Sequence, residues 1–219
     1  MSKLPGIEEL KNRTYGNILA PEFAQTLKRK IFYRTLRGIS DRILALLALT
    51  VFSPLLILLI IAIRIDSKGK AIFAHKRIGK NGKPFTLYKF RTMRADCGAE
   101  EHAPVSLSDP RITRIGKILR KTSLDEVPQF WNIIKGEMSL IGPRPEMPFI
   151  VKQYGEKEKA RLLVKPGLTG FWQIAGRKDL PLHENVEFDL WYIENRSIKL
   201  DLIILIKTVS VIFSGRGAY

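Results

Sequence analysis

The sequence predicts a mixed α/β fold, mostly helical with one small β-hairpin, built as a monotopic membrane protein. Three observations predict it: an apolar run broken at Ser53-Pro54, an Asn81-Gly82 turn between strand-like segments, and helical segments with one apolar and one charged side. We expect a re-entrant helix-break-helix hairpin and interfacial amphipathic helices. The expected parts are an N-terminal arm (1–27), a basic flank with the membrane hairpin (28–70), and a cytosolic domain lying on the membrane (71–219).

Composition narrows the classes of partner. The chain of 219 residues carries 37 basic and 21 acidic side chains, a net charge of +16. Such a charge favours nucleic acid, an anionic membrane leaflet or phosphorylated substrates. The hydrophobic content of 45% allows a real core, and the single Cys97 excludes an internal disulfide.

The longest apolar run, Ile43 to Ile63, is long enough to reach about 30 Å as a helix, the thickness of a bilayer's hydrocarbon. Pro54 removes the hydrogen bond owed to the carbonyl of Thr50 and should kink the helix. The Ser53 hydroxyl is placed to bond back to a preceding carbonyl and soften that loss.

Basic residues outnumber acids on both sides of this run, from Lys28 to Arg42 and from Arg64 to Lys80. The positive-inside rule therefore places both ends on the cytoplasmic face. A helix that enters the membrane, breaks at Ser53-Pro54 and returns satisfies this rule. The alternatives are a kinked spanning helix and a buried core helix.

A β-hairpin is predicted next, with strands over 71–76 and 84–91 around the Asn81-Gly82 turn. Lys89 and Arg91 are two residues apart, so we expect them on one face of the second strand. That face is either a phosphate-binding surface or simply a solvated one.

Residues 111–121 predict a helix with isoleucines and a leucine on one side and basic residues on the other. The acidic pair Asp125 and Glu126 follows, and Pro128 favours a helix that starts near Asp125 and runs to about Lys135. The positive end of that helix would favour a bound phosphate. The alternative interpretation is a capping box, Ser123 with Glu126, of purely structural meaning.

Two loops carry further candidates. Gly142-Pro-Arg-Pro145 holds Arg144 in a stiff backbone suited to bidentate phosphate binding, or is simply a rigid loop. The glycine-rich stretch from Lys165 to Arg177 has the character of a loop over a nucleotide, without P-loop spacing. Residues 182–196 predict a helix, and 198–213 an interfacial amphipathic helix or a core helix.

Short motifs in a fixed order carry a resemblance to one family. They are Ser53-Pro54, Lys76-Arg-Ile-Gly79, Tyr88-Lys-Phe-Arg-Thr-Met93, Asp109-Pro-Arg111 with Arg120, Ser123-Leu-Asp-Glu-Val-Pro-Gln129, Gly136-Glu-Met-Ser139, Gly142-Pro-Arg-Pro145, and Pro166-Gly-Leu-Thr-Gly170 with Gly176-Arg177. The set resembles the bacterial sugar transferases, which are monotopic phosphoglycosyl transferases, from about Lys28 to Tyr219. Without the extra N-terminal membrane helices of long members, the chain resembles the small, exopolysaccharide-initiating form.

One departure is at the entrance to the apolar run. The family usually has Lys-Arg-x-aromatic-Asp, whereas this chain has Arg37-Gly-Ile-Ser-Asp41. An anchoring role for Arg37 and Asp41 is therefore not carried over.

The resemblance implies that a UDP-sugar, expected to carry galactose or glucose, and undecaprenyl phosphate give undecaprenyl-diphospho-sugar and UMP. It implies that Asp125 attacks the β-phosphate and holds the phosphosugar covalently, that Glu126 assists as base or metal support, and that Mg²⁺ binds near Asp125. Residues 71–219 are then the catalytic domain, on the cytoplasmic face of the bacterial inner membrane. The candidate phosphate-binding residues, cationic and close to the motifs, are Arg144 first, then Arg111, Arg120, Lys89, Arg91 and Arg177.

Rival interpretations are a membrane-tethered nucleic-acid-binding protein, a non-catalytic membrane-surface scaffold and a polytopic transferase. The first leaves Asp125-Glu126 and the apolar run unexplained, so we expect no nucleic-acid partner. A scaffold predicts that Asp125→Asn leaves the biological role intact, and a polytopic protein needs more than one convincing apolar run. The oligomeric state stays open, a homodimer included.

Overall fold

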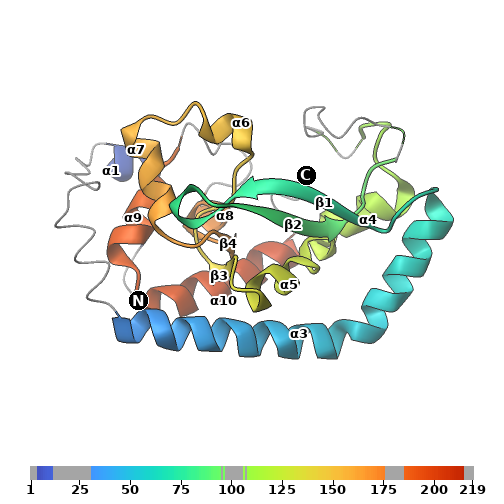
Figure 1. The fold of residues 1–219 in the computed structure, drawn as a ribbon, viewed down its shortest axis with the longest axis horizontal. Coiled ribbons are helices and arrows are strands. Elements are labelled where there is room, and N and C mark those ends of the chain that lie inside the picture. The colour runs from blue at the N-terminus through green and yellow to red at the C-terminus, as the bar shows by residue number, and fades with distance from the viewer. Residues whose placement is uncertain are drawn as a thin grey trace.

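The structure is a computed structural model that describes residues 4–11, 31–94, 96, 106, 108–175 and 185–214 (Figure 1). Most of the predicted N-terminal arm lies outside these residues, but within it Leu10 packs into the main core. In chain order the elements are α1 (Ile7–Lys11), α3 (Ile31–Asp66), β1 (Ile72–Ile78), η1 (Lys80–Gly82), β2 (Pro84–Phe90), α4 (Arg114–Thr122), η2 (Leu124–Glu126), α5 (Gln129–Ile134), β3 (Ser139–Ile141), α6 (Pro148–Val151), α7 (Glu156–Lys159), η3 (Ala160–Leu163), β4 (Gly167–Thr169), α8 (Phe171–Ala175), α9 (Glu187–Asn195) and α10 (Ile198–Ser214).

The predicted β-hairpin is confirmed. β1 and β2 pair antiparallel, from Ile72 opposite Phe90 to Ile78 opposite Pro84. The turn between them needs the left-handed backbone region that asparagine and glycine tolerate best, and Asn81 and Gly82 take φ values of 58° and 73°. A second, short sheet pairs β3 with β4 in parallel.

The main core lies under the hairpin. Phe85 and Leu87 of β2 pack with Ile133 of α5 and with buried side chains of β3, α8, α9 and α10. The predicted helices over 111–121, 182–196 and 198–213 appear as α4, α9 and α10, although residues 182–184 lie outside the described part of the chain. α4 begins at Arg114 because Thr113 caps it, accepting a hydrogen bond from the Gly116 amide at 2.9 Å.

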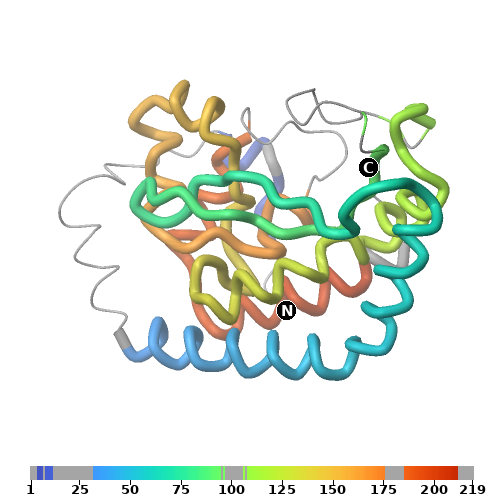
Figure 2. The backbone as a smooth tube through the Cα atoms, turned by 45° about the vertical axis from the view of Figure 1, so that its right-hand side comes forward, coloured from blue at the N-terminus to red at the C-terminus, as the bar shows by residue number. Residues whose placement is uncertain are grey.

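Helix α3 is one helix of 36 residues with Pro54 inside it. Figures 1 and 2 show its first part running along one side of the molecule and its last part turning towards α4. Pro54 offers no N–H to the carbonyl of Thr50, and the Ser53 hydroxyl donates to that carbonyl at 2.7 Å instead. The compensation by Ser53 is confirmed, and the expected helix-break-helix is a single bent helix.

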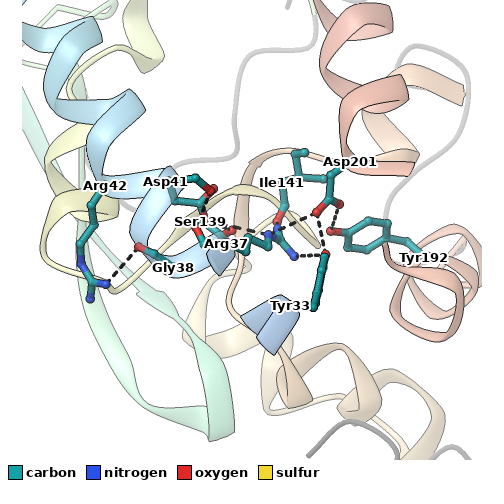
Figure 3. A network of polar contacts seen from close by, with 10 residues as sticks. Tyr33, Arg37, Gly38, Asp41, Arg42, Ser139, Ile141, Tyr192 and Asp201 are labelled. Carbon is teal, nitrogen blue, oxygen red and sulfur yellow. Dashed lines mark hydrogen bonds and ion pairs between the residues drawn. The ribbon is translucent and has the colours of Figure 1, made fainter. Parts of the chain in front are cut away.

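The first part of α3 is docked onto the domain by a buried polar network (Figure 3). Arg37 donates to the carbonyl of Ile141 on β3 and, at 3.0 Å, to the Tyr33 hydroxyl. Tyr33 and Tyr192 each donate to Asp201 of α10, at 2.6 and 2.7 Å. The network joins α3 to β3, α9 and α10, and it explains why the mostly apolar α10 carries an aspartate.

Asp41 extends the same attachment, since it accepts a hydrogen bond from the hydroxyl of Ser139 at the start of β3. Arg37 lies 3.5 Å from the Asp201 carboxylate and 3.9 Å from that of Asp41. Arg37 and Asp41 therefore do anchor α3 to the domain, although the sequence here departs from the family pattern. The hydrogen bonds of Arg37 and Asp41 and the opposing charges offset much of the cost of removing these side chains from water.

The last part of α3 is held at its end. Asp66 accepts a hydrogen bond from the Ile115 amide at 2.9 Å, which ties α3 to the first turn of α4. The side chains of Ile63, Phe90 and Leu119 form a second small core between α3, β2 and α4. The bend thus lets both ends of one long helix rest on the same domain.

Large apolar side chains are exposed along α3 and α10, which lie near each other in both views. Among the described residues, α3 is the helix long and apolar enough to cross a membrane, judged by length and composition, over Phe32–Asp66. An apolar surface of this extent is rare on a soluble monomer and indicates association with a membrane. The exposed residues are Phe32, Leu36, Ile39, Ile43, Leu44, Leu46, Leu47, Val51, Phe52, Ile57, Leu58, Ile61 and Ile65 of α3, and Ile198, Leu202, Ile206 and Val209 of α10.

Candidate active site

The acidic pair lies in a tight turn. Asp125 and Glu126 belong to η2, a single 3₁₀ turn between α4 and α5. Ser123 ends α4 in the left-handed conformation, with φ of 57°, and its amide donates to the Arg120 carbonyl at 3.2 Å. The reversal at Ser123 turns the two carboxyl groups away from the line of α4.

The predicted helix from near Asp125 to about Lys135 is wrong in its first half, because α5 begins only at Gln129. Pro128 is the N-cap residue of α5, where its missing N–H costs no hydrogen bond within the helix. Ser123 makes no side-chain capping hydrogen bond, so the capping-box interpretation is also wrong. With six residues, α5 is too short to supply the predicted phosphate site at a helix N-terminus.

The two carboxyl groups are in different electrostatic states. Burial and then the charge of Glu126 raise the pKa of Asp125 to about 6, against the opposing charges of Lys89, Arg120 and Arg144. Glu126 is instead paired with Arg144, whose Nη2 donates to Glu126 Oε1 at 2.9 Å. Its raised pKa makes Asp125 more basic than an exposed aspartate, which suits a nucleophile or a base.

Three cations from separate elements surround Asp125. Lys89 comes from β2, and burial lowers its pKa while Asp125 opposes that shift. Arg120 comes from the last turn of α4 and is oriented by Thr92, to which its Nε donates at 2.9 Å. Arg144 comes from the loop after β3. A carboxylate among three cations is an arrangement suited to binding phosphate next to a nucleophile.

The other predicted phosphate-binding residues are placed differently. Arg91 lies one residue beyond the end of β2 at Phe90, and its guanidinium donates to the carbonyls of Ser67 and Lys68 at 2.6 and 2.5 Å. It caps the end of α3 and is not gathered with the acidic pair. Arg111 pairs with Asp109 at 2.7 Å, at the edge of the cluster. Arg177 lies outside the described residues.

Asn132 fixes the hairpin relative to the acidic pair, and sequence analysis missed it. This fully buried side chain on α5 accepts from the Tyr88 amide at 3.2 Å and donates to the Thr86 carbonyl at 2.7 Å. It therefore extends β2 sideways onto the helix that follows Asp125. Only its position three residues after the acidic motif, which ends at Gln129, could have drawn attention to it.

Close backbone contacts hold the loop that carries Arg144. Gly142 donates to the Thr169 carbonyl at 2.8 Å, and Gly167 donates to the Pro143 carbonyl at 2.9 Å. A Cβ on Gly142 would lie 2.6 Å from the Lys165 carbonyl oxygen, so only glycine fits there. The expected nucleotide-covering loop is thus wrong for residues 165–175, which form β4 and α8 packed against this loop.

Arg161 supports the same loop from behind and was also missed. It donates to the Arg144 carbonyl at 3.0 Å, to the Tyr154 hydroxyl, and to Asp189 at 2.7 Å. The side chains of Arg161 and Asp189 are 3% and 1% exposed. A buried ion pair on η3 and α9 therefore determines where Arg144 is presented.

Within the described residues, no three His, Cys, Asp or Glu side chains gather closely enough to hold a metal ion by themselves. Asp125 and Glu126 supply two adjacent carboxylates. Mg²⁺ commonly binds through one or two carboxylates together with substrate phosphates and water. The residues therefore fit a metal that arrives with a phosphorylated substrate.

The site belongs to a membrane-associated, phosphate-handling class of protein. The model of the bacterial sugar transferase family matches residues 32–215. The chain belongs to this family.

Named relatives fall in the same group. The undecaprenyl-phosphate galactose phosphotransferase of Salmonella typhimurium is 39% identical over 85% of this chain and 42% of its own length. The UDP-glucose:undecaprenyl-phosphate glucose-1-phosphate transferase of Escherichia coli is 38% identical over 85% and 42%. The exopolysaccharide production protein ExoY of Rhizobium meliloti is 40% identical over 82% and 86%. The chain spans less than half the length of the first two.

Proposed function

We propose that this protein transfers a sugar 1-phosphate from a UDP-sugar to undecaprenyl phosphate, releasing UMP and starting exopolysaccharide assembly. The observation that carries the proposal is the Asp125 carboxyl, of raised pKa, among Lys89, Arg120 and Arg144. The names of the relatives support this donor and acceptor. Those names include galactose, glucose and N-acetylgalactosamine, so the sugar itself is for the experiment below to identify.

In the first step a carboxylate oxygen of Asp125 attacks the phosphorus bonded to the sugar. The bond from that phosphorus to the bridging oxygen breaks, and UMP leaves with the electron pair. Asp125 then carries the sugar phosphate as an acyl phosphate. The raised pKa makes this carboxylate more nucleophilic than an exposed one while leaving it mostly ionised at neutral pH.

In the second step a phosphate oxygen of the lipid acceptor attacks the same phosphorus. The acyl-phosphate P–O bond breaks, which regenerates the Asp125 carboxylate and yields the lipid diphospho-sugar. Covalent storage lets a donor from water and an acceptor from the membrane use one site in turn.

Glu126 acts chiefly through its neighbours. It holds Arg144 by the 2.9 Å hydrogen bond, and its charge raises the pKa of Asp125. Lys89 and Arg120 neutralise the oxygens of the phosphate that Asp125 attacks, and Arg144 neutralises those of a neighbouring phosphate of the substrates. Mg²⁺, bound by Asp125 together with the substrate's phosphates, would supply further charge neutralisation.

The apolar side chains exposed on α3 and α10 would lie in the cytoplasmic leaflet of the inner membrane. The bend in α3, with both its parts packed on one domain, supports a re-entrant course with both ends on the same face. The basic flanks would then meet anionic headgroups, and the site would open where a lipid phosphate lies.

The test is UMP release by detergent-purified protein from a panel of UDP-sugars with Mg²⁺. Without acceptor we expect about one equivalent of UMP per protein and a protein mass increased by one sugar phosphate. Undecaprenyl phosphate should convert this burst into turnover. Asp125→Asn should abolish both signals, Glu126→Gln should retain part of the activity, and Asp96→Asn, at an exposed acid, serves as the control.

Absence of release with every donor would refute the transfer and favour the non-catalytic scaffold. Steeply salt-dependent duplex binding without Mg²⁺ would favour the nucleic-acid alternative. Full activity of Asp125→Asn would remove the nucleophile from the mechanism.

A further inference from the structure

The inner face of the hairpin carries a cation that has no role so far, Arg77. Antiparallel pairing puts Phe73 opposite Lys89, His75 opposite Leu87 and Arg77 opposite Phe85. Directly opposed residues, and residues two apart, share a face of a sheet. Lys89 and Phe73 accordingly meet, with the ammonium nitrogen 5.5 Å from the ring centre. Arg77 therefore faces the same side as the active-site Lys89.

The end of β1 is tied to the loop that carries Arg144. The Ile78 amide donates to the Glu146 carbonyl at 3.0 Å, an isolated antiparallel bridge. Arg77 and Arg144 consequently come from two adjoining segments. Burial, and then the charge of Arg144, lower the pKa of Arg77 to about 10, while Glu146 opposes the shift. Two guanidinium groups are thus near enough to repel each other.

The guanidinium of Arg77 lacks the partners that structural arginines find here. Arg91 donates to backbone carbonyls, and Arg161 donates to a carboxylate, a hydroxyl and a carbonyl. The Nη1 of Arg77 is shielded from solvent and has no hydrogen-bond partner among the described residues. A buried N–H without a partner is costly, and repulsion from Arg144 adds to that cost.

An anion with several oxygens would relieve both costs at once. Arg144 donates one N–H to Glu126 and remains partly exposed, so its guanidinium can accept a second anionic partner. Paired guanidinium groups bind phosphate well because each presents its N–H groups in a fixed plane. Along β2, Lys89 lies four residues from Phe85, the partner of Arg77, so Arg77 is offset along the strand from Lys89, one of the cations beside Asp125.

We propose that Arg77 and Arg144 together bind a substrate phosphate other than the one that Asp125 attacks. This inference rests on the proposed transfer reaction. The chemistry is that of a phosphate monoester or diester, which comes either from the nucleotide that leaves as UMP or from the lipid acceptor. The structure thus adds Arg77 to the site residues. Its motif, Lys76-Arg-Ile-Gly79, was noted in the sequence, but no role was assigned to Arg77 there.

The experiment compares Arg77→Met with Lys76→Met, in detergent and with Mg²⁺. Lys76 is the exposed neighbour on the opposite face of β1, so both variants lose one positive charge from one strand. One arm measures UMP binding by calorimetry, and the other measures undecaprenyl phosphate binding by competition. We expect Arg77→Met to lower the affinity for one of the two ligands at least about tenfold, the scale of one charge-assisted hydrogen bond. Lys76→Met should leave both affinities unchanged. The arm that responds identifies the source of the phosphate.

A stability measurement separates ligand binding from a structural role. Without ligand, Arg77→Met should have a urea midpoint equal to or above that of the wild type, because a buried unpaired N–H and a repulsion are removed. A structural arginine would instead lower the midpoint. Arg77→Lys gives a folded comparison that keeps the charge but lacks the planar donor set, and it should also bind the responding ligand more weakly.

The inference would be overturned if Arg77→Met bound both ligands with unchanged affinity. It would also be overturned if the variant had a lowered urea midpoint and lost affinity equally for both ligands. The proposed transfer reaction fails separately: it fails if the wild type neither binds UMP nor releases it. If the wild type turns over and Arg77→Met is equally active and binds both ligands with the same affinity, the transfer reaction stands and Arg77 is not part of the site.

Discussion

Removing Arg161 should damage stability and catalysis for different reasons, and a double variant can separate them. Arg161→Met leaves the Asp189 carboxylate, 1% exposed, without its buried partner. Removal of one member of a buried ion pair typically costs about 3–5 kcal/mol of unfolding free energy. It also removes the donor to the Arg144 carbonyl, so the loop that presents Arg144 loses its support.

In Arg161→Met/Asp189→Leu the uncompensated charge is gone. What remains is an unpaired Tyr154 hydroxyl and an unpaired Arg144 carbonyl, at about 1–3 kcal/mol for each buried unsatisfied group. The single variant has the same two unpaired groups, so stability should recover by the cost of the uncompensated charge, about 3–5 kcal/mol. Activity should not recover, because a shift of about 1 Å in a substrate-positioning group can reduce the rate about 100-fold.

The assays are urea unfolding in detergent micelles and UMP release under saturating Mg²⁺. Lys157→Met is the matched control, since it breaks an ion pair with Glu187 in which the lysine side chain is half-exposed, and such a pair is worth about 0–1 kcal/mol. A double variant that regains wild-type activity together with its stability would refute the reasoning. Arg161 would then serve only to neutralise Asp189.

Three further predictions follow from the site and the bent helix. Burial and the charge of Glu126 raise the pKa of Asp125 to about 6, so kcat/KM for the UDP-sugar should fall about tenfold per pH unit below about pH 6. A pH profile in which this fall begins only below about pH 4 would contradict the prediction. Gly142→Ala should lower the unfolding free energy by about 1–3 kcal/mol, since its Cβ would lie 2.6 Å from a backbone oxygen. Gly38→Ala, whose Cβ would meet only the end of the Arg42 side chain at 3.8 Å, should not, and equal midpoints for the two variants would argue against the close contact. Pro54→Ala should straighten α3 towards a span, and cysteine labelling that still finds both flanks cytoplasmic would count against Pro54 as the cause of the bend.

The sequence by itself determined the local elements whose physics is short-range. Asn81-Gly82 specifies the hairpin because those two residues accept positive φ without strain. Ser53-Pro54 specifies a bend and its compensation, because the proline and the carbonyl it cannot satisfy lie within one helical turn. The acidic pair could likewise be selected, because two carboxylates in a basic setting are visible in the chain itself.

The tertiary structure decided which cations belong to the site. Lys89 and Arg91 look equivalent in sequence, but β2 ends between them, so alternation no longer relates their side chains, and Arg91 caps α3 instead. Asn132 and Arg161 bond to partners 46 and 17 residues away, which no local pattern encodes. Only packing shows that a buried N–H of Arg77 is left without a partner, because a missing contact is a property of the whole surroundings rather than of the residue.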